Sequence, residues 1–306
     1  MLNSFYSGVS GMKGFQTKLD VIGNNIANVN TVGFKKSRVV FQDFLSKNLA
    51  GANGPTNSQG GTNPMQIGLG TKVSTIDTVQ TQGSPMSTNV GSDLSVDGEA
   101  YFVVVSPQDP NQYLLTKAGN FTLDGGGNLV TTNGYLVAGV AEDNTGVQQA
   151  VPIQIFDDEV SNQKFTSFSV DNSGNINVVR EDGESGKLAK VMDPTDANFG
   201  KYYLNDETSN TNEIISIGTS VVTNPGGLQK VGNSMFVTTA NSGQEFFGRI
   251  EDNAGGQINA GVLEMSNVDL TEEFTEMIVA QRGFQANART ITTSDSIMEE
   301  IVNLKR

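Results

Sequence analysis

The chain has 306 residues, a formal net charge of −14, and no cysteine, histidine or tryptophan. The missing cysteine and histidine exclude disulfides, thiolate metal sites and the commonest general base, and the acidic balance of 33 to 19 disfavours nucleic acid and anionic lipid as partners. Hydrophobic residues make up only 36%, and 35 glycines with many Asn, Ser and Thr favour turn-rich β structure over one large enzyme core.

The first segment, residues 1–30, has helical periodicity, because its apolar residues are three or four positions apart. The predicted apolar stripe includes Phe5, Val9, Met12, Leu19, Ile22 and Ile26. Four glycines lie in the same segment: Gly8, Gly11, Gly14 and Gly23. Each costs about 1 kcal/mol of helix propensity relative to Ala, so the helix needs a partner that covers its stripe. Small residues also allow that partner to approach closely.

Residues 31–75 are predicted to be a linker, since positions 48–66 are rich in Gly and Asn and almost uncharged. The densest basic stretch, Lys35, Lys36 and Arg38, lies near its start, and we expect it to be a solvated loop.

Residues 76–267 are predicted to form a β-rich body. Residues 101–105 form a continuous apolar strand, residues 121–130 and 168–179 form hairpins, and residues 235–237 form a further strand. The charged, turn-prone stretch 180–213 is predicted to be a small insertion in this body.

Three acidic features of the body are candidate ligand sites. The turns at Asp124 and Asp171 resemble the opening of a calcium loop but lack the distal glutamate and flanking helices, so we interpret them as hairpin turns. The acidic run at residues 157–159 is expected to be a solvated loop. No pair of carboxylates is spaced for hydrolysis, and we expect no enzymatic activity, cofactor or metal.

The last segment, residues 268–306, repeats apolar residues with alternating gaps of four and three, which is typical of a heptad seam. The predicted seam includes Leu270, Phe274, Met277, Phe284, Ile291 and Met298. Asp269 or Thr271 can cap the start of this helix. The pattern predicts an α+β fold, with terminal α-helices pairing as a coiled coil and a β-rich body with a small insertion. The helices form either an intramolecular hairpin or pairs with copies of themselves. Their widened apolar faces and their positions at the chain ends favour the second alternative, in which the helices also pair with copies of themselves.

Two long stretches resemble a known family. LDVIGNNIANVNTVGFKKSRVVFQDF, residues 19–44, is similar to the N-terminal signature of bacterial flagellar rod and hook proteins, and residues 266–306 are similar to their C-terminal signature. Within that family VIGNNIAN, MIVAQRGFQAN and the terminal VNLKR resemble hook subunits. The long segment 41–68 resembles distal rod subunits, which are the alternative.

The resemblance implies a homo-oligomeric helical polymer, a hollow tube that acts as a universal joint and transmits torque for motility. It implies an inner coiled-coil layer around a channel and an outer β layer. The implied partners are the distal rod protein, the hook cap, the hook–filament junction protein and the flagellar export gate. It also implies a position in the basal body and hook, outside the cell.

Export by the flagellar type III apparatus is likewise implied by the resemblance, and it agrees with the absence of a Sec signal and of any apolar run of about 18 residues. We therefore expect no membrane insertion. Phe41 and Leu45 in FQDFL resemble the export-gate motif of such subunits, and a buried linker anchor is an equal alternative. A secreted β-rich adhesin or binding module is the competing functional class, but it needs no apolar stripes at both ends.

Overall fold

The computed structural model describes residues 2–55, 60–106, 113–142, 147–158, 160, 163–193, 198–205, 213–253 and 255–304. These residues fall into two compact units. The first unit consists of residues 1–29, 36–79 and 268–306, and the second, the body, consists of residues 30–35 and 80–267. The chain therefore passes between the units four times. The first unit carries ten acidic and ten basic residues, so the whole net charge of −14 belongs to the body.

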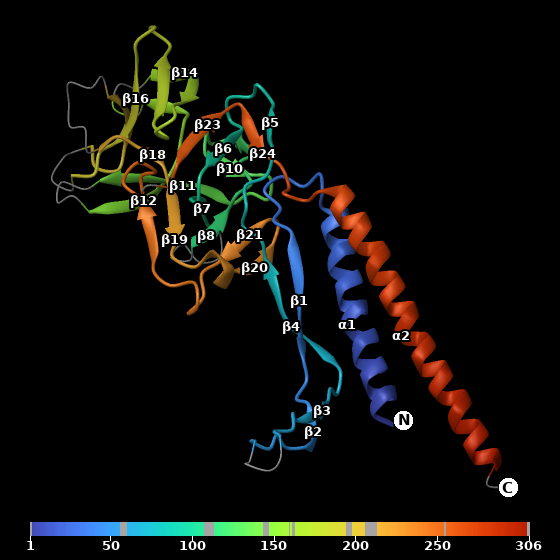
Figure 1. The fold of residues 1–306 in the computed structure, drawn as a ribbon. Helices are drawn as coiled ribbons and strands as arrows, with labels where there is room; N and C mark the ends of the chain where they lie inside the picture. The colour runs from blue at the N-terminus through green and yellow to red at the C-terminus, as the bar shows by residue number, and fades with distance from the viewer. Residues whose placement is uncertain are drawn as a thin grey trace. The chain divides into compact units, whose positions relative to one another are not determined.

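The first unit contains the two predicted terminal helices, α1 (Leu2–Ala27) and α2 (Leu270–Leu304). They pack along one another (Figure 1). Asp269 caps α2, because its Oδ1 accepts the amides of Thr271 at 2.8 Å and Glu272 at 3.3 Å. Neither helix combines the length and the continuous apolar character that crossing a bilayer requires, as far as the described residues extend.

A long β-ribbon completes the first unit and replaces much of the linker expected at residues 31–75. β1 (Ser37–Asp43) pairs antiparallel with β4 (Thr71–Thr78), and β2 (Lys47–Ala50) pairs with β3 (Met65–Ile67). Isolated two-stranded ribbons are marginal in water. Here α1 supports the ribbon, since it packs on β1 and β4. Composition suggested a linker because the Gly/Asn-rich residues gather between β2 and β3.

The body contains one large sheet of eleven strands in the described residues. Its strands are β7 (Tyr101–Val105), β8 (Tyr113–Thr116), β9 (Phe121–Leu123), β10 (Leu129–Thr131), β11 (Leu136–Glu142), β12 (Gln148–Pro152), β18 (Ser216–Ile217), β19 (Thr219–Val222), β20 (Gln229–Gly232), β21 (Met235–Val237) and β22 (Glu245–Gly248). The main order is β20-β21-β8-β7-β11-β10-β9, with β12 and β18 on β11, and β19 between β7 and β22.

A smaller sheet and two strand pairs complete the body. The smaller sheet runs in sequence order through β13 (Asp157–Asp158), β14 (Gln163–Val170), β15 (Ile176–Arg180), β16 (Ser185–Lys190) and β17 (Tyr202–Asn205). The strand pairs are β6 (Leu94–Asp97) with β23 (Gln257–Ala260), and β5 (Pro85–Ser87) with β24 (Val262–Glu264). A short 3₁₀ helix lies at Pro225–Gly227.

The core of the body lies on both sides of β7. Phe102 and Val104 belong to the main apolar cluster, whereas Tyr101 and Val103 belong to a second cluster. All four are at most 1% exposed. This explains why the sequence of β7 is an unbroken apolar run rather than an alternation, and the predicted strand is confirmed.

The smaller sheet differs from the insertion expected at residues 180–213. The sheet begins at Asp157, and residue 180 ends a strand that pairs with β16. Asp158, expected in a solvated loop, is fully buried and accepts Arg180 Nη2 at 2.9 Å. The charges therefore hold the sheet together instead of marking a boundary. Residues 159, 194–197 and 206–212 lie outside the described residues.

The two calcium-like turns are hairpin turns, as predicted. Asp124 Oδ1 accepts the amides of Gly126 at 2.9 Å and Asn128 at 2.8 Å, between β9 and β10. Asp171 Oδ1 accepts the amide of Ser173, between β14 and β15. Both carboxylates are engaged by their own turns, and no group of three potential metal ligands occurs among the residues that the structure describes.

Candidate assembly interface

The contact between α1 and α2 is made largely by small residues. A Cβ at Gly8 would lie 3.3 Å from Ile291 Cγ1, and one at Gly11 would lie 3.0 Å from the Asn287 side chain. On α2, a Cβ at Gly283 would lie 2.6 Å from Phe15 Cζ. Two of the four glycines that weaken α1 as an isolated helix, Gly8 and Gly11, therefore let the two helices approach closely.

Alanine at two glycines should separate crowding from helix propensity. Gly23→Ala is expected to stabilise the helices by about 1 kcal/mol, because nothing lies within 4 Å of its Cβ position. Gly283→Ala gains the same propensity but crowds Phe15, which costs about 1–3 kcal/mol. Thermal melts followed by circular dichroism at 222 nm should give Gly283→Ala a lower melting temperature than Gly23→Ala. Equal melting temperatures would show that the Phe15 ring moves aside freely.

The face that α2 turns toward α1 includes part of the predicted seam, because Ile291 lies against Gly8, and it also includes residues outside that seam. The buried residues of α2 are Glu273 and Ala280, and the partly buried Asn287 follows at the same seven-residue spacing. Of the predicted seam, Ile22 is 2% exposed, and the half-buried members are Val9, Met12, Leu19, Ile26, Met277, Phe284 and Ile291. The exposed members are Phe5, Leu270, Phe274 and Met298.

A polar cluster that the sequence analysis missed lies between α1, α2 and β1. Asn25 is 1% exposed, and its Nδ2 donates to Ser37 O at 2.8 Å and to Glu273 Oε2 at 3.2 Å. Its Oδ1 accepts the amide of Ser37 at 3.0 Å. One side chain thereby fixes the positions of three elements. One sequence signal pointed to this cluster. Glu273 lies seven residues before Ala280, so it shares a face of α2 with that small apolar residue.

The buried Glu273 makes the helix contact sensitive to pH. Burial raises the pKa of Glu273 above its ordinary value of 4.5, although the hydrogen bond from Asn25 and the charge of Lys36 oppose the rise. A carboxyl with a raised folded-state pKa contributes stability below pH 4.5, and that contribution is lost as pH rises through the raised value.

Glu273→Gln is therefore expected to stabilise the helices more at pH 7 than at pH 4. Asp269 has the opposite effect, because the amides of Thr271 and Glu272 lower its pKa, but it is present in both proteins and cancels in the comparison. Thermal melts of the helices, made on the parent and on Glu273→Gln at pH 7 and pH 4, measure this difference in stability. Equal melting temperatures of the variant and the parent at both pH values would contradict the raised pKa of Glu273.

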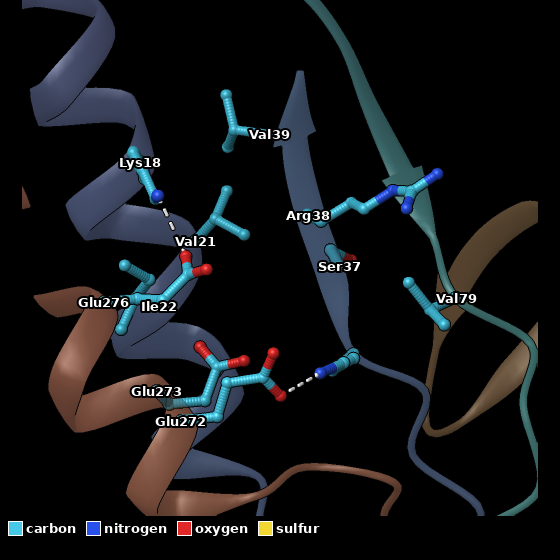
Figure 2. A pocket seen from close by; sticks show the side chains of 11 residues that line it. Lys18, Val21, Ile22, Ser37, Arg38, Val39, Val79, Glu272, Glu273 and Glu276 are labelled. Carbon is cyan, nitrogen blue, oxygen red and sulfur yellow. Dashed lines mark hydrogen bonds and ion pairs between the residues drawn. The ribbon is translucent and has the colours of Figure 1, made fainter. Parts of the chain in front are cut away.

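A cleft of about 360 Å³ opens beside this cluster (Figure 2). Val21, Ile22 and Val39 contribute apolar walls. Lys18 reaches Glu276 at 2.9 Å and Lys36 reaches Glu272 at 2.8 Å across its rim. Both glutamates are about half exposed, so each pair contributes about 1 kcal/mol at most. These two ion pairs therefore help to position the first turns of α2, but they contribute little to its stability.

Much of α2 presents apolar side chains to solvent. Phe274 is 50% exposed, Ile278 59% and Val279 58%. Near the end of the helix the exposed apolar residues are Ile297, Met298, Ile301, Val302 and Leu304. Large exposed apolar surfaces on a soluble chain mark interaction sites.

The two residues of the predicted export-gate motif lie in different surroundings. Phe41 packs on α1, with its ring 5.8 Å from the ring of Phe15. Leu45 is 88% exposed and lines a second cleft of about 430 Å³ with Tyr6, Phe44 and Leu69. Phe41 is nevertheless 36% exposed, so neither residue is a buried anchor in this chain, and the export-gate motif stays a prediction.

Comparison with protein families gives three matches along the chain. Residues 5–35 match the family described as flagella basal body rod protein, and residues 95–178 match the flagellar hook protein FlgE/F/G D1 domain. Residues 259–304 match the flagellar basal body rod FlgEFG protein C-terminal family. The matched ends contain all of α2 and α1 from residue 5 onward.

Full-length relatives agree with these matches. The chain is 45% identical over 307 residues to the flagellar basal-body rod protein FlgG of Bacillus subtilis, covering all of both chains. It is 32% identical over 444 residues to the flagellar hook protein FlgE of Borreliella burgdorferi, and 32% identical over 313 residues to FlgG of the same organism, again covering all of each chain. The chain belongs to the family of flagellar basal-body rod and hook proteins, which are structural proteins.

Proposed function

We propose that the chain polymerises through its terminal helices into a hollow helical tube, the inner layer of which is a coiled coil of neighbouring copies. The observation that carries this proposal is the exposed apolar surface of α2, because α1 covers only one side of it. α2 has 35 residues and α1 has 26, so about 13 Å of α2 extends beyond the length of α1, at 1.5 Å per residue. A sister copy would cover the exposed apolar side of α2 and the part of α2 that extends beyond the length of α1.

The geometry of such contacts favours an open polymer. A surface on α2 that binds a different surface of the next copy is a heterologous contact, and heterologous contacts that do not close generate a helical tube. Each contact buries apolar side chains at about 25 cal/mol per Å². We propose that the body forms the outer layer, and that the subunit leaves the cell through the flagellar export gate.

Within the family we propose the hook as the position of this subunit. MIVAQRGFQAN and VNLKR near the end of the chain support it, and hook proteins are among the full-length relatives. The tube would then bend while transmitting torque, with the distal rod protein, the hook cap and the hook–filament junction protein as neighbours.

A position in the basal-body rod is the second candidate. The 45% identity to a rod protein supports it, and so does length, because the alignment to that protein spans 307 positions. The alignments to two hook proteins span 444 and 466 positions, so those chains have many residues that this chain lacks.

Two experiments test these proposals. Concentrated full-length protein should form tubes in electron micrographs, and a chain limited to residues 30–267 should remain a β-rich monomer by light scattering. Tubes from the shortened chain would overturn the helix-based mechanism, and a full-length chain that stays monomeric would favour the adhesin class. Deleting the gene and imaging isolated basal bodies separates the positions: complete rods without hooks support the hook, and truncated rods support the rod.

A further inference from the structure

A buried ion pair lies in the body, where the sequence predicted a solvated basic loop. Lys35 is 1% exposed and Glu264 is 2% exposed, and Lys35 Nζ lies 2.6 Å from Glu264 Oε1. Lys35 Nζ also donates to Thr81 O at 2.8 Å, and the amide of Gly83 donates to Glu264 Oε1 at 2.9 Å. We call Lys35, Thr81, Gly83 and Glu264 the root clamp.

Main-chain bonds join the same three segments around the root clamp. The amide of Gly33 donates to Glu264 O at 2.8 Å, and the amide of Met265 donates to Ser84 O at 3.0 Å. Gly33 has φ +67°, and a Cβ there would lie 2.6 Å from Ala118 N, so the close approach requires glycine. Asn267 Nδ2 adds a bond to Thr81 O at 3.1 Å.

The three segments are those through which the chain enters and leaves the body. The body's first piece is residues 30–35, its second piece begins at residue 80, and it ends at residue 267. Lys35, Thr81 and Glu264 therefore lie one to three residues from three of the four passages between the units. We propose that the root clamp is a conformational device that holds the entry and exit segments of the body in one arrangement, whether or not the rest of the chain is ordered.

The charges around the root clamp explain why an ion pair suits this role. Lys117 is 4% exposed, and burial lowers its pKa to about 8, with the charge of Glu264 opposing that effect. Lys117 Nζ donates to Gly98 O at 2.7 Å and lies 5.1 Å from the centroid of the Tyr101 ring. Without the charge of Glu264, the buried Lys35 would lose its ion-pair partner, and Lys117 would lose one of the carboxylates that oppose the fall of its pKa. An apolar pair could fill the same space, but it would not position Thr81 and Gly83.

Hydrogen exchange on the full-length protein, kept dilute so that it is monomeric, tests the proposal. In Glu264→Gln the amides of Gly33, Gly83 and Met265 should lose protection at least tenfold more than those of Val103 and Leu115 in the core. Glu184→Gln is the control, since it neutralises a 68% exposed partner of Arg180 in the same body. Loss of protection spread evenly over the body would overturn the proposal.

A double variant, Lys35→Met with Glu264→Leu, keeps the test decisive if the single variant fails to fold. It should recover the melting temperature of the parent while the amides of Gly33 and Met265 remain poorly protected. Recovery of both the melting temperature and the protection would show that the pair is ordinary core packing and refute the proposal. Because the measurement is made on the monomer, its outcome does not depend on whether the chain polymerises.

Discussion

Ile278→Asp is expected to weaken polymerisation strongly while leaving the monomer folded. The Ile278 side chain is 59% exposed on α2, so the monomer loses little packing when it is replaced. If a sister copy covers it, the variant loses about 1.5–3 kcal/mol of apolar burial and must also desolvate a carboxylate. The critical concentration for polymerisation should therefore rise by more than about tenfold, since 1.4 kcal/mol corresponds to one factor of ten. Sedimentation of the polymer measures it.

Gln285→Asp provides the matched control for that experiment. Gln285 is an exposed polar residue of the same helix, so the control adds the same charge without removing an apolar side chain, and it loses at least as much helix propensity as Ile278→Asp. It should polymerise near the parental concentration and show the same helical signal as Ile278→Asp. Normal tubes from Ile278→Asp would mean that this surface of α2 stays in solvent.

Asn25→Ala should destabilise the helices by about 2–4 kcal/mol, because three hydrogen bonds to partly or fully buried partners disappear. Those partners are Ser37 N, Ser37 O and Glu273 Oε2. The described α-helices belong to the first unit, so the circular dichroism signal at 222 nm reports mainly on that unit. Its melting temperature should fall, and tube formation should weaken with it.

The neighbouring Asn24→Ala separates the hydrogen bonds from helix propensity. Asn24 is exposed on the same turn of α1, and both replacements gain the propensity of alanine. Asn24→Ala should melt at or slightly above the parental temperature. If the two variants melt together, the cluster around Asn25 contributes nothing measurable to the helix contact.

The helices were predictable from the sequence because local signals define them. The apolar period and the capping Asp269 locate the start of α2 at Leu270. The contact between the helices was predictable only in part, because the apolar repeat has more than one face. Ile291 of the predicted seam lies against Gly8, whereas the buried Glu273 and Ala280 lie outside that seam. Periodicity reports which side chains are apolar, but it does not report which neighbour covers them.

Long-range pairing explains the remaining differences. Lys35 was expected in a loop because its partner Glu264 is 229 residues away in the sequence. Asp158 was expected in solvent because Arg180 follows only after a hairpin. The ribbon of β1 and β4 was missed because residues 44–70 lie between its strands. In each case the structure depends on a partner that is distant in sequence: an ion pair for Lys35 and Asp158, and strand pairing for the ribbon.

The partition of charge between the units has a consequence for the solution behaviour of any polymer. Copies joined through the electrically neutral first unit bring no net charge to their junctions, whereas every added copy brings −14 in its body. Such a tube is a polyanion with a cloud of counter-ions, and at physiological salt neighbouring tubes repel one another mainly at surface separations within about 8 Å, the screening length. Single tubes should stay dispersed at low ionic strength, and divalent cations should make them bundle side by side.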